Sequence, residues 1–392
     1  MNPLVTVVTP SYNQGRFIRA TIESVLAQDY PAIEYIVMDG GSTDETAAVV
    51  SEYAGRLKWI SEKDRGQSHA INKGFRMARG EFVSWLNSDD LILPGAVRHA
   101  VETFGRNPDL GAVYGEGYLI DETGDARRRF PATEPFNLWK LIHLSDFVLQ
   151  QTLYFRKCVF DEVGYLDENL HWGMDWEILM RIGKRYPIEY IPQYMGSLRE
   201  YGEAKTFSGG ARRFRELARI MRLHSGKRYP PGYITYGLDT YEKIWNGWVE
   251  RHSPEFLGGV SAIVQKYITL GCRYWIDRTL REAQGWYSDG WAAPVVKYML
   301  PPGRGKLRIE GMQPDLGLPR HDQEIRVIGN RTLLQRTAVP LGEFEVALPL
   351  TPANGAPVAL ELKASRSFRP GRKNGDSRRL AYVLKRVQWV PE

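Results

Sequence analysis

Cysteine is scarce in this chain of 392 residues, which contains only Cys158 and Cys272. Two cysteines so far apart argue against a disulfide scaffold and against a structural zinc site, and they fit a reducing compartment. No apolar run approaches the roughly 20 residues that a membrane helix needs, and the first residues enter a strand without a signal peptide. We therefore expect a cytoplasmic protein whose contact with a membrane, if it has one, is peripheral at the inner face.

Dense runs of lysine or arginine are also missing, although the net charge is +6. The short clusters Arg127–Arg129 and Arg212–Arg213 are typical of solvated surfaces. We therefore expect no nucleic-acid partner. A mildly basic chain still fits a polyanionic substrate or an acidic membrane surface.

Strand-like and helix-like patterns alternate through the first 105 residues. A polar loop follows three of the strands, and the strand–loop pairs are 4–9 with 11–13, 33–38 with 39–44, and 81–86 with 87–90. This alternation predicts a doubly wound, mostly parallel sheet. Because the carboxyl ends of parallel strands share one edge of a sheet, we expect the three loops to converge on a ligand site there.

Two adjacent carboxylates, Asp89 and Asp90, follow the last of these strands. They repel each other unless a cation or the hydroxyls of a ligand share the site. Oxygen ligands of this kind suit Mg²⁺ or Mn²⁺, which commonly bridges carboxylates to substrate phosphates. The alternative is a solvated turn in which one aspartate caps the next helix. Both interpretations stay open from these residues alone.

Asp175 lies near the start of an amphipathic helix that we expect from His171 to about Arg185. One interpretation is a first-turn acid that the helix dipole stabilises. The other is a general base, because a carboxylate beside Trp172 and Trp176 is partly desolvated and gains basicity. The spacing does not choose between them.

The second half of the chain changes character twice. Gly210–His224 predicts an amphipathic basic helix, which either packs on the preceding domain with solvated arginines or rests on an anionic membrane. Further helices are expected at Tyr233–Arg251 and Pro254–Arg281, where they buttress that domain or form an oligomer contact. After Pro301–Gly305, short strands separated by turn residues predict an all-β module, a sandwich or jelly roll. Such a module binds glycan, mediates assembly or stabilises the rest of the chain.

Five motifs in the first half occur in a family-specific order: Val-Thr-Pro-Ser-Tyr-Asn13, Val-Met-Asp-Gly-Gly-Ser-Thr-Asp44, Asp-Arg-Gly-Gln-Ser-His-Ala-Ile-Asn-Lys-Gly74, Trp-Leu-Asn-Ser-Asp-Asp90 and Gly-Met-Asp-Trp-Glu177. With them, residues 4–206 resemble the inverting glycosyltransferases of family 2, which have the GT-A fold. The resemblance implies a nucleoside-diphosphate sugar as donor, a divalent metal ion (Mn²⁺ or Mg²⁺) on its diphosphate, and a base that activates the acceptor.

The resemblance also implies roles for individual residues. On the donor side, Pro10 and Tyr12 line the base pocket, and Asp39 accepts a hydrogen bond from the base. Gln67 lies near the base or the diphosphate, and Asn87 and Ser88 belong to the donor-binding signature. Asp89 contacts ribose or metal, and Asp90 holds the metal. Asp175 corresponds to the catalytic base. The neighbouring residues His171, Trp172, Trp176 and Glu177 would shape the acceptor site.

Three positions depart from the family pattern. Asn87 stands where many relatives have Asp, so two carboxylates remain rather than three. Met174 replaces the Glu of the family's Glu-Asp pair and removes a charge next to Asp175. Tyr201 stands where relatives often carry a His that assists the metal. The implied metal site is therefore weaker, or completed by Asp90 and phosphates alone.

These patterns together predict three parts: a GT-A catalytic domain at 1–208, a helical extension at 209–300 and a β module at 301–392. The predicted activity is that of an inverting glycosyltransferase of the hexosyltransferase type, acting in surface-polysaccharide synthesis. The donor is a nucleoside-diphosphate sugar, with a UDP-sugar favoured, and the acceptor is a hydroxyl of a glycan or lipid-linked glycan.

Two alternatives remain from the sequence. A sugar nucleotidyltransferase would use a similar sheet and metal-bound acids but release pyrophosphate. A non-catalytic glycan-binding or scaffold protein would bind sugar without turnover. The retained carboxylates Asp39, Asp89, Asp90 and Asp175 argue against such decay.

Overall fold

The computed structural model describes residues 2–130, 133–202, 209–252, 292, 294–300, 304–314, 323–329, 332–350, 358–367 and 380–391. The chain forms two compact units. The first contains Met1–Phe136 and Asp146–Ile220, and the second contains Asn137–Ser145 and Met221–Glu392. The first unit therefore extends past residue 208 into the expected helical extension.

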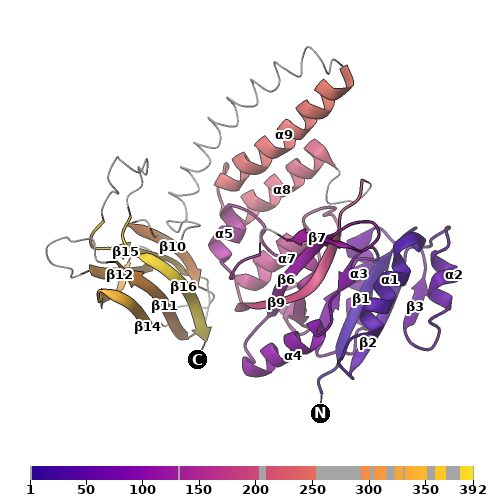
Figure 1. Ribbon diagram of the computed structural model, residues 1–392, viewed down its shortest axis with the longest axis horizontal. Coiled ribbons are helices and arrows are strands. Elements are labelled where there is room, and N and C mark those ends of the chain that lie inside the picture. Colours follow the sequence, from indigo (N-terminus) through magenta and orange to yellow (C-terminus); the bar gives the residue numbers. More distant parts are fainter. Residues whose placement is uncertain are drawn as a thin grey trace. The chain divides into compact units, whose positions relative to one another are not determined.

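Four parallel strands form one half of the sheet in the first unit (Figure 1). Their order is β3-β2-β1-β4, and their bounds are β1 Val5–Ser11, β2 Ile33–Asp39, β3 Lys58–Ser61 and β4 Phe82–Trp85. The register pairs Ser11 with Asp39, so β1 and β2 end at the same level. The polar loops that follow β1, β2 and β4 therefore start from one edge of the sheet, as the sequence predicted.

The other half of the sheet is mixed. It contains β5 (Leu91–Ile92), β6 (Ala112–Ile120), β7 (Ala126–Arg129), β8 (Tyr154–Arg156) and β9 (Ile188–Arg199). β8 is antiparallel to both β4 and β6, whereas β6 and β9 run parallel. β5 pairs antiparallel with β9, and β7 with β6. β9 is therefore the strand whose carboxyl end approaches the loop after β4.

The sequence Gln-Gln-Thr-Leu-Tyr-Phe-Arg156 by itself predicts one strand over Gln150–Arg156, and this prediction is only partly correct. Residues Gln150–Thr152 form a 3₁₀ helix, η1, and the strand β8 begins at Tyr154. The backbone N–H of Thr152 donates to the carbonyl of Leu149, and that of Leu153 donates to Gln150. These local bonds take the place of a ladder, and both glutamine side chains are buried.

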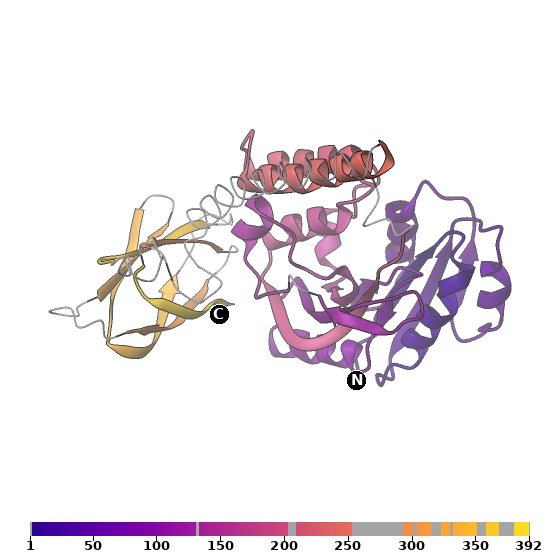
Figure 2. The ribbon, with the colours of Figure 1, turned by 45° about the horizontal axis from the view of Figure 1, so that its top comes forward.

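Helices pack on both faces of this sheet. α1 (Gly15–Leu26), α2 (Thr46–Ser51) and α4 (Ala96–Arg106) share one core with Val5 and Val7 of β1. α3 (Gln67–Met77) packs on the other face, where a Cβ at Gly74 would lie 2.5 Å from Val8. Phe160 of α6 (Val159–Val163) contacts the rings of Phe75 and Phe155 on that side. α7 (Met174–Gly183) follows α6 in the chain. Figure 2 shows the strands of the first unit with helices on both sides of them.

α8 (Gly210–Ser225) follows the residues of the first unit that carry the motifs. Phe214, Leu217 and Ile220 are buried, whereas Arg212, Arg215, Arg219 and Arg222 are exposed. The helix therefore packs through its apolar side. Contact of the exposed arginines with a membrane stays a prediction.

The second unit begins with helices and ends in a β-sandwich. Its helices are α5 (Leu138–His143) and α9 (Pro231–His252), and the helix expected at Pro254–Arg281 lies outside the described residues. Self-association through these helices stays a prediction. None of the helices that the structure describes is both long and apolar enough to cross a membrane.

Two antiparallel sheets make up the sandwich. One has the order β10-β15-β12-β13 and the other β14-β11-β16. The bounds are β10 Val295–Leu300, β11 Gly305–Gln313, β12 Gln323–Gly329, β13 Thr332–Val339, β14 Gly342–Leu350, β15 Val358–Ala364 and β16 Val383–Pro391. Alternate residues of β11 and β12, such as Leu307 and Ile325, enter one shared core. The predicted all-β module is confirmed, and β10 starts it before residue 301.

Candidate functional site

The loops after β1 and β2 are bound to each other by side-chain hydrogen bonds. Asn13 adopts a positive φ of 52° in the first of these loops. Its backbone N–H donates to Ser42 Oγ (2.8 Å), and its Oδ1 accepts from the N–H of Thr43 (2.9 Å). Asp39 is buried and accepts from Ser42 Oγ and Ser61 Oγ, both at 2.5 Å. Asp39 therefore braces the loop, and both its carboxylate oxygens already have protein partners.

Tyr12 is the exposed aromatic residue of this loop pair, with 62% of its surface accessible, while Pro10 is buried beside it in β1. Gly40 lies between Tyr12 and Asp64. A Cβ at Gly40 would lie 3.3 Å from Tyr12 Cδ2 and 2.8 Å from Asp64 Oδ2. An aromatic face beside a side-chain-free backbone position is a surface on which a planar base can stack. Asp64 was not singled out from the sequence.

Gln67 and Asn87 join this surface to the loop after β4. Gln67 Nε2 donates to Asn87 Oδ1 (2.7 Å), and Asn87 Nδ2 donates to Gln150 Oε1 (3.1 Å). Gln150 in turn donates to the carbonyl of Trp85 (2.9 Å). Ser88 is buried. Gln67 thus contacts Asn87 directly, and Gln150 joins Asn87 to the end of β4. The doublet Gln150-Gln151 was visible in the sequence but was interpreted as part of a strand.

Asp90 is buried and fully engaged. Its Oδ2 accepts from Gln151 Nε2 (2.6 Å) and Asn87 Nδ2 (3.0 Å), and its Oδ1 accepts from the N–H of Arg199 (2.9 Å). Burial, and then the charge of Asp89, raises the pKa of Asp90 to about 8. The geometry makes Asp90 a brace between the turn after β4, η1 and the end of β9. The burial of Asp90 and these hydrogen bonds argue against its expected role of holding a metal ion on the diphosphate.

Asp89 is the partly exposed member of the pair. Its Oδ2 accepts from the Tyr201 hydroxyl (2.7 Å), and its carbonyl accepts from Arg199 Nε (2.7 Å). Burial raises the pKa of Asp89, and the bond from Tyr201 opposes that rise. Burial, together with the charge of Asp89, also raises the pKa of Tyr201, which keeps its proton for this bond.

A divalent metal ion would find few protein ligands here. No group of three or more Asp, Glu, His or Cys side chains arranged for a metal occurs among the residues that the structure describes. Mg²⁺ is commonly bound through one or two carboxylates, with substrate phosphates and water as its other ligands. Asp89 fits that chemistry, because Tyr201 occupies only one of its two oxygens.

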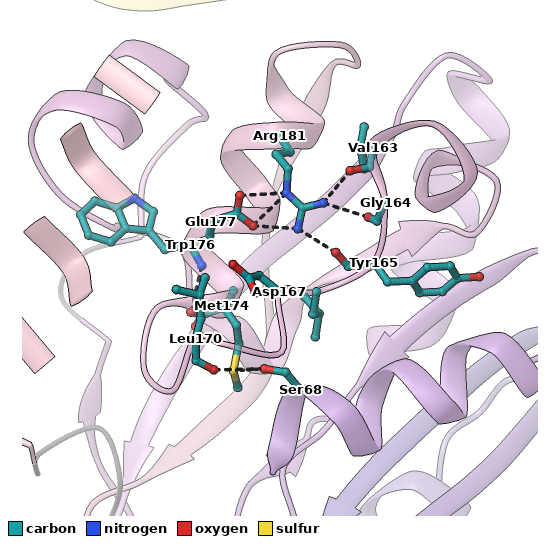
Figure 3. A network of polar contacts seen from close by, with 12 residues as sticks. Ser68, Val163, Gly164, Tyr165, Asp167, Leu170, Met174, Trp176, Glu177 and Arg181 are labelled. Atoms are coloured by element: carbon teal, nitrogen blue, oxygen red, sulfur yellow. Dashed lines mark hydrogen bonds and ion pairs between the residues drawn. The ribbon is translucent and has the colours of Figure 1, made fainter. Parts of the chain in front are cut away.

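Asp175 is half-buried in the first turn of α7, and its Oδ1 accepts from the N–H of Trp176 (2.9 Å). The segment before it is held by α3. Ser68 Oγ lies 3.0 Å from Met174 Sδ and 3.4 Å from the carbonyl of Leu170 (Figure 3). Gln67 and Ser68 are neighbours, so one helix end contacts both the donor signature and the turn that carries Asp175.

The four residues expected around the acceptor separate into two pairs. His171 is exposed and Trp172 is half-buried. Trp176 is buried, with 1% of its surface accessible, and Glu177 is buried in an ion pair with Arg181. Arg181 also donates to the carbonyls that end α6 (Figure 3). We therefore leave Trp176 and Glu177, as parts of the core, out of the acceptor site.

Asp146 is an acidic neighbour of Asp175 that the motifs did not reveal. Burial, and then the charge of Asp175, raises the pKa of Asp146 to about 8, while its bonds from backbone N–H groups and the charge of Arg213 oppose the rise. Its Oδ1 accepts from the N–H of Val148 (3.0 Å). Met174 supplies no charge beside Asp175. The second acidic group near Asp175 is Asp146, which lies in the segment before η1.

Comparisons with known proteins agree with this architecture. A family model described as glycosyl transferase family 2 matches residues 6–160. An uncharacterised glycosyltransferase of Mycobacterium tuberculosis is 33% identical over 241 residues, which cover 59% of this chain and 87% of that protein. The chondroitin synthase of Escherichia coli is 36% identical over 192 residues, which cover 48% of this chain and 28% of that protein. The chain also spans only about a third of the length of several other curated relatives that it matches.

A solved structure is similar to a large part of the chain. It is S. aureus TarS 1-349 in complex with UDP-GlcNAc, with a TM-score of 0.47 and 18% sequence identity, and it covers 62% of this chain and 73% of that chain. The family model and the M. tuberculosis relative, of which the chain covers 87%, show the family, and the sheet order of the first unit fits it. The chain belongs to glycosyltransferase family 2, and its first unit has the GT-A fold.

Proposed function

We propose that this protein is an inverting hexosyltransferase that moves a sugar from a nucleoside-diphosphate sugar, with a UDP-sugar favoured, to a hydroxyl of a glycan or lipid-linked glycan. Membership of the family supports sugar transfer. The observation that carries the rest is the position of Asp175. It lies half-buried at the start of α7, in a turn held by the same end of α3 whose Gln67 bonds to the loop after β4.

The donor would lie along the carboxyl ends of β1, β2 and β4. In this proposal the ring of Tyr12 stacks on the base over Gly40, and Pro10 and Asp39 shape the loops beneath it. The bonded pair Gln67 and Asn87, with Ser88, stays assigned to the donor. Asp64 is added to these residues because its carboxylate, like the ring of Tyr12, lies against Gly40.

A bound Mg²⁺ or Mn²⁺ ion would neutralise the negative charge that develops on the leaving diphosphate. Asp89 would hold it through the carboxylate oxygen that Tyr201 leaves open. Asp90 would contribute indirectly, because its hydrogen bonds fix the turn on which Asp89 lies.

The transfer itself is a single displacement. Asp175 accepts the proton of the acceptor hydroxyl while that oxygen attacks C1 of the sugar from the face opposite the diphosphate. The bond between C1 and the phosphate oxygen breaks, and the nucleoside diphosphate leaves with the electron pair, so the anomeric configuration inverts. A positioned base of this kind is typically worth about 10²–10⁴-fold in rate. His171 and Trp172, before Asp175, would contact the acceptor.

The proposal is tested by calorimetric titration with UDP, dTDP and GDP, each with and without Mn²⁺, followed by analysis of the released nucleotide. We expect one of the three nucleoside diphosphates to bind more tightly with Mn²⁺ than without it. The same nucleoside diphosphate should be released when the corresponding sugar nucleotide is turned over. Release of pyrophosphate would show a nucleotidyltransferase instead. Absence of binding by all three nucleotides would contradict a donor site.

A further inference from the structure

The turn before α7 is held by a carboxylate from α8. Gly173, the residue that precedes the helix, has no side-chain cap. Instead Glu216 accepts three consecutive backbone N–H groups. Its Oε1 accepts from Trp172 (2.7 Å) and Gly173 (2.9 Å), and its Oε2 accepts from His171 (2.9 Å). Gly173 is the cap residue of α7, and His171 and Trp172 precede it, so one carboxylate satisfies three backbone donors in a row. The N-terminus of a helix also favours negative charge, which Glu216 provides here.

Close packing fixes the same turn from the side of α8. A Cβ at Gly173 would lie 2.7 Å from Ile220 Cδ1 and 2.8 Å from Leu217 Cδ2. Gly209, which precedes α8 and has a φ of +93°, lies against Trp172, and a Cβ there would be 2.5 Å from the indole Cζ2. Contacts this short leave no room for a side chain at either glycine. At each of these glycines, therefore, the backbone of one segment packs directly against a side chain of the other.

Glu216 lies outside all five sequence motifs and 43 to 45 residues after its partners. These partners include the exposed His171 and end two residues before Asp175. A small displacement of a reacting group, about 1 Å, costs on the order of 10²-fold in rate. The backbone that sets the direction of Asp175 thus depends on one carboxylate of α8.

We propose that Glu216 is a positioning residue for the transfer reaction: by binding the N–H groups of residues 171–173, it fixes Asp175 and the acceptor-side turn relative to the donor. This inference rests on the proposed function of Asp175. It adds α8, which lies outside all five motifs, to the elements that form the acceptor site.

The test compares Glu216→Gln with the full-length wild type and with Glu52→Gln as a matched control. Glu52 is an exposed partner of Arg19 on the helices α1 and α2, so its change to Gln keeps the same chemistry without touching the turn. At position 216, the new amide keeps one acceptor oxygen but turns an NH₂ donor toward backbone donors. The probes are UDP binding, amide hydrogen exchange over residues 171–176, and UDP release from UDP-N-acetylglucosamine, UDP-glucose and UDP-galactose with water or free sugars as acceptor.

We expect Glu216→Gln to lower kcat roughly 10–100-fold, with faster amide exchange at the turn and unchanged affinity for UDP. In an Asp175→Asn background, Glu216→Gln should cost almost nothing further, because both changes remove the same function. Glu216→Asp, which keeps the charge on a shorter arm, should restore part of the rate. It also serves as the test variant should Glu216→Gln fail to fold.

Unchanged kcat in the folded variants, unchanged exchange at the turn, or a full additional loss in the Asp175→Asn background would overturn the inference. The two proposals fail separately. If Asp175→Asn itself keeps full turnover, the proposed function is wrong. If Asp175→Asn abolishes turnover while the Glu216 variants keep it, only the role of Glu216 is wrong.

Discussion

The proposed donor side and the proposed acceptor side of the first unit are built in different ways. On the donor side, loops that follow neighbouring strands bind one another through their own motif residues, such as Asn13 with Ser42 and Thr43. On the acceptor side, the turn before α7 has no cap of its own and is held by Ser68 from α3 and Glu216 from α8. The loops after β1 and β2 are therefore held by residues of their own motifs, whereas the turn before α7 is held by side chains from other helices.

The largest expected effect is on the acceptor side. Asp175→Asn should lower transfer about 10²–10⁴-fold, because it removes the group that accepts the acceptor proton. Affinity for UDP, measured by calorimetry, should stay unchanged, since the donor residues are untouched. An equal loss of turnover and of UDP binding would contradict the division between the two sides.

The paired aspartates allow a matched test of the donor side. Asp89→Asn should lower the Mn²⁺-dependent part of UDP affinity at least about tenfold, since even the outer partners of metal ligands are typically worth 10–100-fold. Asp90→Asn should instead destabilise the fold by about 1–3 kcal/mol, because the new amide faces the donors of Gln151, Asn87 and Arg199. Calorimetry with and without Mn²⁺, and urea unfolding, measure the two effects. Reversed results would return the metal to Asp90.

The base-stacking surface is tested with alanine at Gly40. The new methyl group would displace Asp64 and crowd Tyr12, so we expect UDP binding to weaken by up to roughly 1–3 kcal/mol, the usual worth of stacking on an aromatic ring. Gly105→Ala is the control, because no atom lies within 4 Å of a Cβ there. Equal UDP affinity in both variants would remove Tyr12 and Gly40 from the donor site.

A further expected effect, of which the sign rather than the size is tested, is a change in the pH dependence of stability. The pKa of Asp146 is raised to about 8 in the folded protein, whereas in the unfolded chain it is near 4. The folded state thus holds the proton more tightly, and the stability that this confers is lost as the pH rises through about 8. The free energy of unfolding, measured with urea, should fall less steeply between about pH 4 and pH 8 in Asp146→Asn than in the wild type. Parallel curves would show that Asp146 titrates normally.

Much of the fold could be predicted from sequence because its signals are local. The β-branched runs of β1 and β2 and the apolar stripe of α1 each predict their element without knowledge of the rest. η1 was mistaken for part of a strand because Gln150–Thr152 lead directly into the residues of β8, whereas the backbone bonds of η1 close within four residues. The pairing of β8 and β9 within the sheet was not predicted, since it depends on contacts between segments distant in the chain.

The candidate site follows the same division. Motif residues such as Tyr12 and Asp89 were found because they lie directly after strands. The sequence does not show whether a carboxylate is exposed or buried, so Asp89 and Asp90 are equivalent in it. In the structure, Gln151 and the backbone of Arg199 enclose Asp90. Asp146 and Glu216 carried no signal at all, since nothing near them in sequence resembles a site.

By itself, the sequence determined the family, the parallel core of the first unit, the β module and the side of the sheet on which the donor loops lie. It did so because hydrophobic period, turn residues and motif spacing act over a few residues. Only the tertiary structure decided which aspartate can face a ligand and which group holds the turn before Asp175. Burial and hydrogen bonding between α7 and α8 exist only when segments more than 40 residues apart have come together.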